Sequence, residues 1–298
     1  MKVLYLKIAE LCLKVTLESR ICRLPDNYTP FLIAESEVEE LLSEIFVGDA
    51  CLVFEDVAEE LIAHFEDLGF VQEIYKSRSG GYVFQIYDTD GALAAVMSSD
   101  AKFLCNKVAI VARNEPSVIF GLNNMLMVAF AFSSAYRSVL TVHSSVVVKG
   151  GWGYMFLGRS GTGKSTHTSL WLKNISNTSL LNDDNPVVRI VEGNAIVYGS
   201  PWSGKTPCYK QEKVKVGACV MLEQKPYNRI SRQDVLRSFS AMMSSCSLMV
   251  WDSGSYDCLV ETITLMVSSV PMFRLECLPD EDAAVLSYKT INRNEAPV

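Results

Sequence analysis

Histidine is scarce in this sequence, and cysteine never occurs as a closely spaced pair. The chain of 298 residues has three histidines, and its nine cysteines include no Cys-x-x-Cys pair. Structural zinc sites need cysteine and histidine at short spacing, so the sequence predicts no zinc site. The cysteines are odd in number, and several lie in apolar runs such as Phe103-Leu104-Cys105 and Ala218-Cys219-Val220. This pattern favours buried free thiols in a reducing compartment over a disulfide framework.

The sequence also lacks an excess of positive charge and a long apolar run. Its net charge is −7, so nothing in the charge balance indicates a nucleic acid or an anionic membrane as a partner. The longest apolar stretch, around residues 125–132, is far shorter than a bilayer crossing requires. Lys7 and Glu10 interrupt the first residues before the apolar core of a signal peptide can form. We therefore expect a soluble cytoplasmic protein.

Repeats, low-complexity segments and an obvious flexible linker are absent as well, yet the chain has two parts of different character. Residues 1–118 are rich in strand patterns and poor in chemically distinctive residues, which predicts a mixed, strand-rich N-terminal lobe of unknown role. Within it, residues 11–17 alternate as a half-buried strand does, and residues 82–87 and 92–97 flank the turn sequence Asp88-Thr89-Asp90-Gly91. Helices are expected at 37–46 and at 57–68, the second capped by Asp56 and closed by Gly69.

Residues 119–298 are predicted to form a second domain with an α/β fold. Its strands are linked by hairpins too often for a simple doubly wound sheet, which indicates a mixed sheet. Helices are expected at 122–137, 164–174, 232–246 and 255–269, and strands at 139–143, 145–148, 154–157, 180–181, 187–191, 195–198, 214–222 and 272–278.

One motif in this domain carries a specific chemistry. The sequence Gly158-Arg159-Ser160-Gly161-Thr162-Gly163-Lys164-Ser165 fits the P-loop, or Walker A, pattern G-x-x-x-x-G-K-[ST]. Glycines let backbone N–H groups curl around phosphate oxygens, and the helix that begins at Lys164 directs its positive end at the same anion. Lys164 is expected to bridge the β- and γ-phosphates of ATP, Ser165 to hold Mg²⁺, and Thr166 to complete the nucleotide site. A glycine-rich turn that happens to contain Lys-Ser is the alternative.

Two carboxylates follow the strand predicted at 180–181. Asp183 and Asp184 would end that strand beside the phosphate site, where one can hold Mg²⁺ while the other accepts a proton from an attacking hydroxyl. The alternative is an ordinary turn, because Asn-Asp-Asp-Asn-Pro has the composition of one. His143, at the end of the strand at 139–143, is either an active-site residue or a satisfied core or surface histidine. For His64 and His167 a structural role is expected.

Other candidates are less specific. The loop Gly199-Ser200-Pro201-Trp202-Ser203-Gly204-Lys205 has glycines near both ends, one aromatic residue and one cation. It could cover the phosphates or the acceptor, or it could be a turn-rich connection. Arg159 and Arg189 are further candidate cations, with an exposed solvated position as the alternative for each.

The motifs taken in order resemble a known family. The strings His143-Ser144-Ser145-Val146, Phe156-Leu157-Gly158 with the loop that follows, and Leu181-Asn182-Asp183-Asp184 are similar to the core of HPr kinase/phosphorylase. They also resemble ATP-dependent phosphoenolpyruvate carboxykinase, whose nucleotide-binding domain has the same fold. The resemblance covers residues 139–222 and implies a P-loop core of this type.

The resemblance implies roles for individual residues as well. It places His143 near the γ-phosphate and the metal, and it makes Asp183 the general base and Asp184 a metal ligand. With Lys164, these residues would form the catalytic site of an ATP- and Mg²⁺-dependent kinase, and by resemblance an assembly of identical chains is expected. Where HPr kinase carries a Glu-Ile-Arg-Gly-type segment, this chain has Val197-Tyr198-Gly199-Ser200-Pro201-Trp202, so the likeness does not extend to the acceptor site.

Three functions follow from these observations. The first is transfer of the γ-phosphoryl group of ATP to a hydroxyl, on a protein serine or on a small molecule. The second is carboxykinase-like chemistry on a keto acid. The third is a nucleotide-binding module without turnover, which uses ATP as a structural or regulatory ligand.

Overall fold

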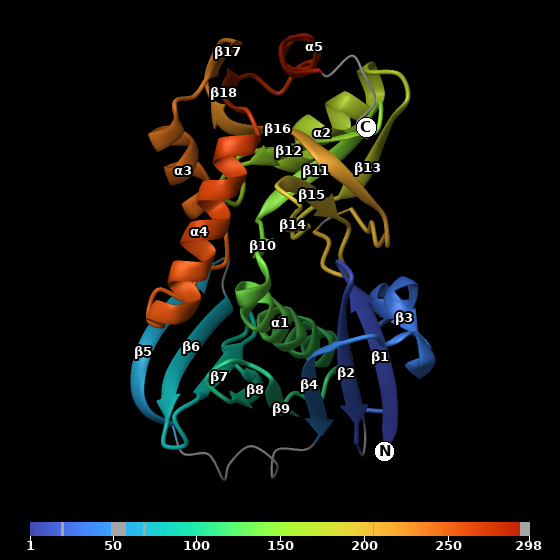
Figure 1. Cartoon of the computed structure of the whole chain (residues 1–298), viewed down its shortest axis with the longest axis vertical. Helices are drawn as coiled ribbons and strands as arrows, with labels where there is room; N and C mark the ends of the chain where they lie inside the picture. The colour runs from blue at the N-terminus through green and yellow to red at the C-terminus, as the bar shows by residue number, and fades with distance from the viewer. Residues whose placement is uncertain (19–20, 49–57, 68–69, 205, 293–298) are drawn as a thin grey trace. The chain divides into compact units, whose positions relative to one another are not determined.

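A computed structural model describes residues 1–18, 21–48, 58–67, 70–204 and 206–292 (Figure 1). The chain divides into two compact units, Met1–Ser134 and Ala135–Val298. Each unit is a mixed α/β structure built on one large sheet, in agreement with the mixed α/β class that the sequence predicts. The division lies beyond the boundary expected at residue 118, because the helix α1 (Glu115–Ser133) packs on strands of the first unit.

The described part of the first unit forms a nine-stranded sheet in the order β3-β1-β2-β4-β9-β8-β7-β6-β5. The pairs β2–β4 and β4–β9 are parallel, and the other neighbouring strands are antiparallel. The strands are β1 (Lys2–Ile8), β2 (Leu11–Leu17), β3 (Leu32–Ile33), β4 (Leu41–Gly48), β5 (Ala58–Asp67), β6 (Phe70–Ser77), β7 (Tyr82–Tyr87), β8 (Leu93–Ser99) and β9 (Cys105–Ile110), with short 3₁₀ helices η1 (Asp26–Phe31) and η2 (Glu35–Glu37).

The predicted hairpin is confirmed as β7 and β8. In its turn the Asp88 carboxylate accepts the backbone N–H groups of Asp90 and Ala92, each at 3.0 Å. Gly91 has φ +74°, a left-handed conformation that glycine adopts without strain. The turn sequence therefore closes the connection locally, and the Ser117 hydroxyl of α1 donates to the other Asp88 oxygen at 2.6 Å.

The two helices expected in the first unit are wrong. Residues 37–46 lead into β4, and residues 58–67 form β5; Asp56, Val57, Leu68 and Gly69 lie outside the described residues. β4 runs between β2 and β9 with Ile45 and Val47 fully buried, so pairing with distant strands overrides the helical preference of the leucines and glutamates in residues 37–46.

The helix expected at 122–137 is present as α1, but it begins earlier, at Glu115, and ends at Ser133. Within the described residues, one helical stretch, Glu115–Arg137, is long and apolar enough to cross a membrane, but 67 % of its most apolar window is buried inside the structure. Gly121 brings α1 close to β8, since a Cβ atom there would lie 3.0 Å from Ala95 Cβ. The apolar character of α1 therefore fits a core helix.

The described part of the second unit also forms a nine-stranded sheet. Seven strands follow the order β10-β14-β15-β16-β12-β11-β13, and β18 pairs with both β16 and β17. β16 is parallel to β12 and β18, whereas the remaining pairs are antiparallel, so the predicted mixed sheet is confirmed. The strands are β10 (Val139–Thr141), β11 (Ser144–Lys149), β12 (Trp152–Leu157), β13 (Thr178–Asn182), β14 (Val187–Val191), β15 (Asn194–Tyr198), β16 (Lys213–Gln224), β17 (Arg229–Arg232) and β18 (Met272–Cys277).

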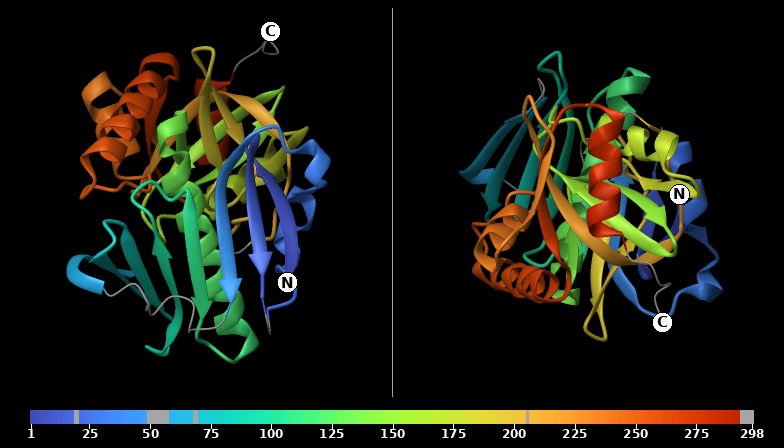
Figure 2. Two further views of the ribbon diagram at one scale, coloured as in Figure 1. Left: turned by 60° about the horizontal axis from the view of Figure 1, so that its bottom comes forward. Right: turned by 90° about the horizontal axis from the view of Figure 1, so that it is seen from above.

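Helices cover both faces of this second sheet (Figure 2). One hydrophobic cluster lies under α2 (Lys164–Asn174) and α5 (Glu281–Ile291), and another under α3 (Val235–Met243) and α4 (Ser253–Ser269). β12 shows the alternation: Tyr154 and Phe156 belong to the first cluster, and Met155 and Leu157 to the second. Both faces of β12 are therefore buried, which fixes the strand that leads into the glycine-rich loop.

The free thiols expected from the sequence are present. All eight cysteines in the described residues are free; Cys51 lies outside them. Cys219 is fully buried, and burial raises the pKa of its thiol to about 12. Cys105, the first residue of β9, is exposed, contrary to the expectation from its apolar neighbours.

His167 is a buried structural residue, as predicted. Its Nε2 atom lies 3.1 Å from the Ser287 hydroxyl, which also accepts the Trp171 indole N–H at 2.8 Å. These bonds fasten α2 to α5. Burial lowers the pKa of His167 from 6.5 to about 4, against a weaker opposing effect of Asp280.

This depressed pKa predicts a pH-dependent stability. Between pH 6.5 and 4 the unfolded chain binds a proton at residue 167 that the folded chain excludes, so stability falls as the pH drops through this window. We expect a loss of about 2 kcal/mol between pH 7 and pH 5. Denaturant unfolding followed by tryptophan fluorescence measures it, because all four tryptophans lie in the second unit. His167→Gln should flatten this dependence, whereas His64→Gln, at an exposed position, should retain it.

Candidate functional site

The glycine-rich loop lies between β12 and α2. Gly161 has φ +77° and Gly163 has φ +103°, and a Cβ atom at either position would meet open space. The glycines are therefore required by the backbone conformation and not by a close neighbour. Gly163 is the N-cap of α2, and the Thr162 backbone N–H donates to the Arg159 carbonyl at 3.1 Å. The loop thus forms a tight curve that ends at the positive end of a helix.

Lys164 connects this loop to two residues from other elements. Its Nζ atom lies 2.7 Å from His143 Nε2 and 2.9 Å from the Gly158 carbonyl oxygen, and the residue is only 8 % exposed. On the far side of the ring, His143 Nδ1 lies 3.0 Å from Asp184 Oδ1. Because an ammonium group only donates, His143 Nε2 accepts from Lys164 and Nδ1–H donates to Asp184. A cation, an imidazole and a carboxylate therefore form one line.

Asp183 belongs to a second, buried chain of polar groups. The Ser145 hydroxyl donates to Asp183 Oδ1 at 2.6 Å and lies 3.1 Å from Thr168 Oγ1. Thr168 is on α2, one turn after Lys164, and its hydroxyl lies 3.0 Å from the Ser165 carbonyl oxygen. Asp183 is 4 % exposed, and its Oδ2 atom is buried without a hydrogen-bond partner. A buried carboxylate oxygen without a partner is costly and indicates a place for a further donor.

The candidate loop at 199–205 packs against the double aspartate. Asn182 donates from Nδ2 to the Ser200 hydroxyl and to the Trp202 carbonyl, each at 3.1 Å. Gly204 approaches so closely that a Cβ atom there would lie 2.8 Å from the Asp183 carbonyl oxygen. Lys205 lies outside the described residues. The loop is therefore tied to the strand end that presents the two carboxylates.

The remaining sequence candidates occupy different places. Ser165 and Thr166 lie in the first turn of α2, and Arg159 is exposed in the loop, where its carbonyl also accepts the Thr162 hydroxyl at 2.6 Å. Arg189 lies within β14, between its partners Val139 and Ile196. His64 is on β5 of the first unit, 3.6 Å from a Glu73 carboxylate oxygen. The structure thus brings together His143, Lys164 and Asp184, with Asp183 adjacent in sequence.

Three polar residues near the site were not singled out from the sequence. The Ser145 hydroxyl contacts Asp183, and the Thr168 hydroxyl contacts Ser145. The Gln224 side chain contacts the loop carbonyls of Gly161 and Thr162. The available signal for Ser145 was its hydroxyl two positions after His143, directly before the apolar run Val146–Val148. The other two depend on packing between distant segments.

Ser145 offers a prediction about the buried chain. Ser145→Ala removes the donor to Asp183 and leaves both oxygens of a buried carboxylate without a protein partner. We expect a loss of about 1–3 kcal/mol in the unfolding free energy of the second unit, measured by tryptophan fluorescence. Ser144→Ala is the matched control, because the Ser144 hydroxyl makes only a 3.4 Å contact to the Val142 carbonyl. Equal effects of the two changes would contradict a specific role for the Ser145 bond.

The donor set limits how a metal ion could bind here. Among the described residues, no group of three or more histidine, cysteine, aspartate and glutamate side chains is arranged to hold a metal ion. Mg²⁺ is often held by only one or two carboxylates together with substrate phosphates and water. These residues therefore do not form a Mg²⁺ site made of protein ligands alone. They fit a site in which protein carboxylates and nucleotide phosphates hold the ion together.

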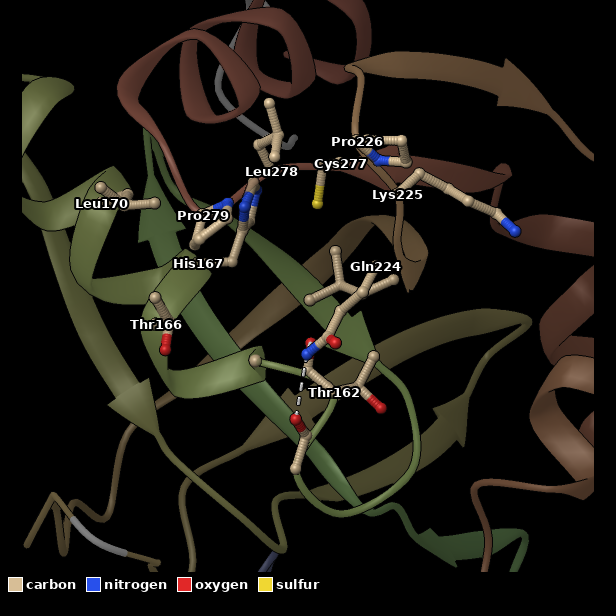
Figure 3. A pocket seen from close by; sticks show the side chains of 13 residues that line it. Thr162, Thr166, His167, Leu170, Gln224, Lys225, Pro226, Cys277, Leu278 and Pro279 are labelled. Atoms are coloured by element: carbon tan, nitrogen blue, oxygen red, sulfur yellow. Dashed lines mark hydrogen bonds between the residues drawn. The ribbon is translucent and has the colours of Figure 1, made fainter.

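A cavity of about 730 Å³ opens beside the loop (Figure 3). It lies between Gly161, Thr162 and Gly163 of the loop, the first turns of α2, and the segments where β16 and β18 end. Its size is in the range typical of small-molecule sites.

Comparisons with known proteins give a distant structural likeness. No protein-family model matches the chain, and no curated protein matches its sequence. Among solved structures, the Hpr(Ser) kinase/phosphatase from Coxiella burnetii is similar at a TM-score of 0.29 and 11 % sequence identity, over 50 % of this chain and 86 % of that one. The relationship is a distant structural one, and the site described above stands on its own geometry.

Proposed function

We propose that this protein is an ATP- and Mg²⁺-dependent phosphotransferase that moves the γ-phosphoryl group to a hydroxyl acceptor, in the cytoplasm. The observation that carries the proposal is the line Lys164–His143–Asp184 at the start of α2, directly beside Asp183 with its unpartnered carboxylate oxygen. A phosphoryl-transfer site needs a cation for the phosphates, a carboxylate for the metal and an acceptor for the proton. These three groups converge here.

The loop supplies the phosphate site in this proposal. Residues 158–165 present backbone N–H groups and the positive end of α2, and the open sides of Gly161 and Gly163 leave room for phosphate oxygens. Lys164 would exchange its bonds to His143 and the Gly158 carbonyl for the β- and γ-phosphate oxygens. His143 then remains oriented through its bond to Asp184.

Ser165 and Asp184 are the residues proposed to hold Mg²⁺. Asp184 is a third exposed, and its two oxygens contact His143 and Asn185 at 3.0 and 2.8 Å, so it is oriented and accessible. When bound, the ion supplies neutralising charge at the β- and γ-phosphate oxygens.

Asp183 is proposed as the general base. Asp183 Oδ2 is buried in this structure, so it must become accessible when the substrates bind. The acceptor hydroxyl then loses its proton to Asp183 Oδ2 while its oxygen forms a bond to the γ-phosphorus. The bond between that phosphorus and the β,γ-bridging oxygen breaks, and ADP leaves with the electron pair. Ser145 holds the other carboxylate oxygen in place. The catalytic contribution of the chain is therefore positioning and charge stabilisation.

The direct test incubates the protein with γ-labelled ATP, Mg²⁺ and a panel of proteins and small molecules that carry hydroxyl groups. Label on an acceptor, dependent on both ATP and Mg²⁺, is the expected result. Release of carbon dioxide from oxaloacetate would instead identify carboxykinase-like chemistry, and nucleotide binding without hydrolysis or transfer would identify a non-catalytic module. Either outcome would overturn the proposed reaction.

A further inference from the structure

The cavity beside the loop has aliphatic walls. Leu170 of α2 lies on one side, and Pro226, Leu278 and Pro279 contribute from the segments that follow β16 and β18 (Figure 3). These side chains can contact the faces of a flat ring by dispersion and by exclusion of water. These side chains have no donor or acceptor that could recognise the hydrogen-bonding edge of a base.

The polar side chains of the lining are largely engaged by the protein itself. Gln224 Nε2 donates to the Gly161 and Thr162 carbonyl oxygens at 3.3 and 3.2 Å. Lys225 is directed away from the cavity and pairs with Glu223 at 2.9 Å. His167, which also lines the cavity, has its Nε2 atom 3.1 Å from the Ser287 hydroxyl. The side-chain nitrogen atoms of Gln224 and Lys225 and the Nε2 atom of His167 are therefore engaged within the protein.

The backbone around the cavity is engaged in the same way. The Lys225 N–H donates to the Cys277 carbonyl at 3.1 Å, and the Leu278 N–H donates to Asn228 Oδ1 at 2.8 Å. Of the remaining polar groups in the lining, the Thr166 hydroxyl and the Cys277 thiol are both small, and a thiol is a weak hydrogen-bonding group. The cavity therefore has shape and apolar surface but few groups that could distinguish one base from another.

We propose that this cavity receives the base and ribose of the nucleotide and accepts adenine and guanine nearly alike. The inference rests on the proposed function, because the base reaches the cavity only when the phosphates lie in the loop at 158–165. Thr162 and Thr166, which belong to both the loop region and the cavity lining, mark the point where the two sites join.

The expected discrimination follows from the chemistry of the walls. A site that hydrogen-bonds the distinguishing edge rejects a wrong ligand by about 10⁴-fold or more, whereas apolar pockets discriminate by about 10–200-fold. We expect the dissociation constants of Mg·ATP and Mg·GTP to agree within about tenfold. Mg·CTP should bind more weakly than either, because a single ring buries less apolar surface.

Titration calorimetry with Mg·ATP, Mg·GTP, Mg·CTP and Mg·tripolyphosphate tests this inference on the full chain. Tripolyphosphate has no base, so it reports on the loop alone. Leu170→Trp and Leu278→Trp fill the cavity from two sides and should weaken both purine nucleotides by about tenfold or more, toward the affinity of tripolyphosphate. Leu172→Trp is the matched control, since Leu172 is on the same helix but is exposed and outside the lining.

The outcomes separate this inference from the proposed function. A preference for ATP over GTP of more than a hundredfold would overturn base tolerance. If the nucleotides bind no more tightly than tripolyphosphate, the cavity is not the nucleoside site. The same conclusion follows if they bind both filled variants as tightly as the parent protein. In either case the phosphate site in the loop remains supported. If tripolyphosphate itself fails to bind the parent protein, the phosphate site and the inference built on it both fall.

Discussion

Lys164→Ala is expected to lower phosphoryl transfer by about 10²–10³-fold, because it removes the cation that stabilises charge on the transferring group. Nucleotide affinity should fall as well. The Lys164 ammonium group lies in the loop, where it contacts the Gly158 carbonyl oxygen and His143 Nε2. The measurement is ADP release in the presence of the acceptor identified by the labelling screen.

The control for this change is Lys173→Ala. Lys173 lies in the last turn of the same helix, at an exposed position, so it alters the charge of the protein by the same amount far from the loop. Tryptophan fluorescence on denaturation verifies that both variants remain folded. Equal turnover of the two variants would contradict the role assigned to Lys164.

Asp183→Asn is expected to reduce transfer by about 10²–10⁴-fold while nucleotide binding stays close to that of the parent. The amide keeps the size of the carboxylate and can still accept the Ser145 bond, but it cannot take a proton from the acceptor. Single-turnover transfer and calorimetry with Mg·ATP measure the two effects separately.

Asp184→Asn provides the comparison for the second carboxylate. Because Asp184 is proposed as a metal ligand and as the partner of His143, its loss should raise the Mg²⁺ concentration needed for activity. A transfer rate in Asp183→Asn equal to that of the parent would remove Asp183 from the mechanism. If only Asp183→Asn raises the Mg²⁺ concentration needed for activity, Asp183 is the metal ligand and Asp184 takes the role of the base.

Many elements of the second unit could be predicted from the sequence because their signals are local, whereas α5 and β17 were not predicted. Helix α2 has the bounds predicted for it, 164–174, since Gly163 in a left-handed conformation starts it and the β-branched Ile175 follows its last residue. Hairpins such as β14–β15 also form between neighbours in sequence, with Gly193 in the turn. For these elements the pattern and the final packing favour the same structure.

The first unit was harder to read because its strands find partners far along the chain. β4 pairs with β2 and with β9. Glu44, for example, lies between Lys14 of β2 and Cys105 of β9, both of which are distant in the sequence. A segment with leucine and glutamate has a local preference for helix that only these long-range pairs reverse. The same limit explains why the boundary expected at residue 118 falls within α1, which packs on strands of the first unit.

The spacing of the motifs placed His143, Lys164 and the two aspartates near each other, but the hydroxyl chain could not be derived from it. Ser145 reaches Asp183 because β11 pairs with β13 in a register that shifts between Val146 and Val147. A shift of one residue would turn Ser145 to the other face of the sheet. The cavity likewise depends on three segments from separate parts of the chain.

The central claim is that the backbone of residues 158–165 binds nucleotide phosphates. Titration calorimetry of the unmodified protein with Mg·ADP, repeated in the presence of saturating Mg·tripolyphosphate, tests it most directly. We predict saturable binding with one nucleotide per chain, and loss of the signal when tripolyphosphate occupies the loop. Absence of heat with Mg·ADP, or binding that tripolyphosphate leaves unchanged, would contradict the claim.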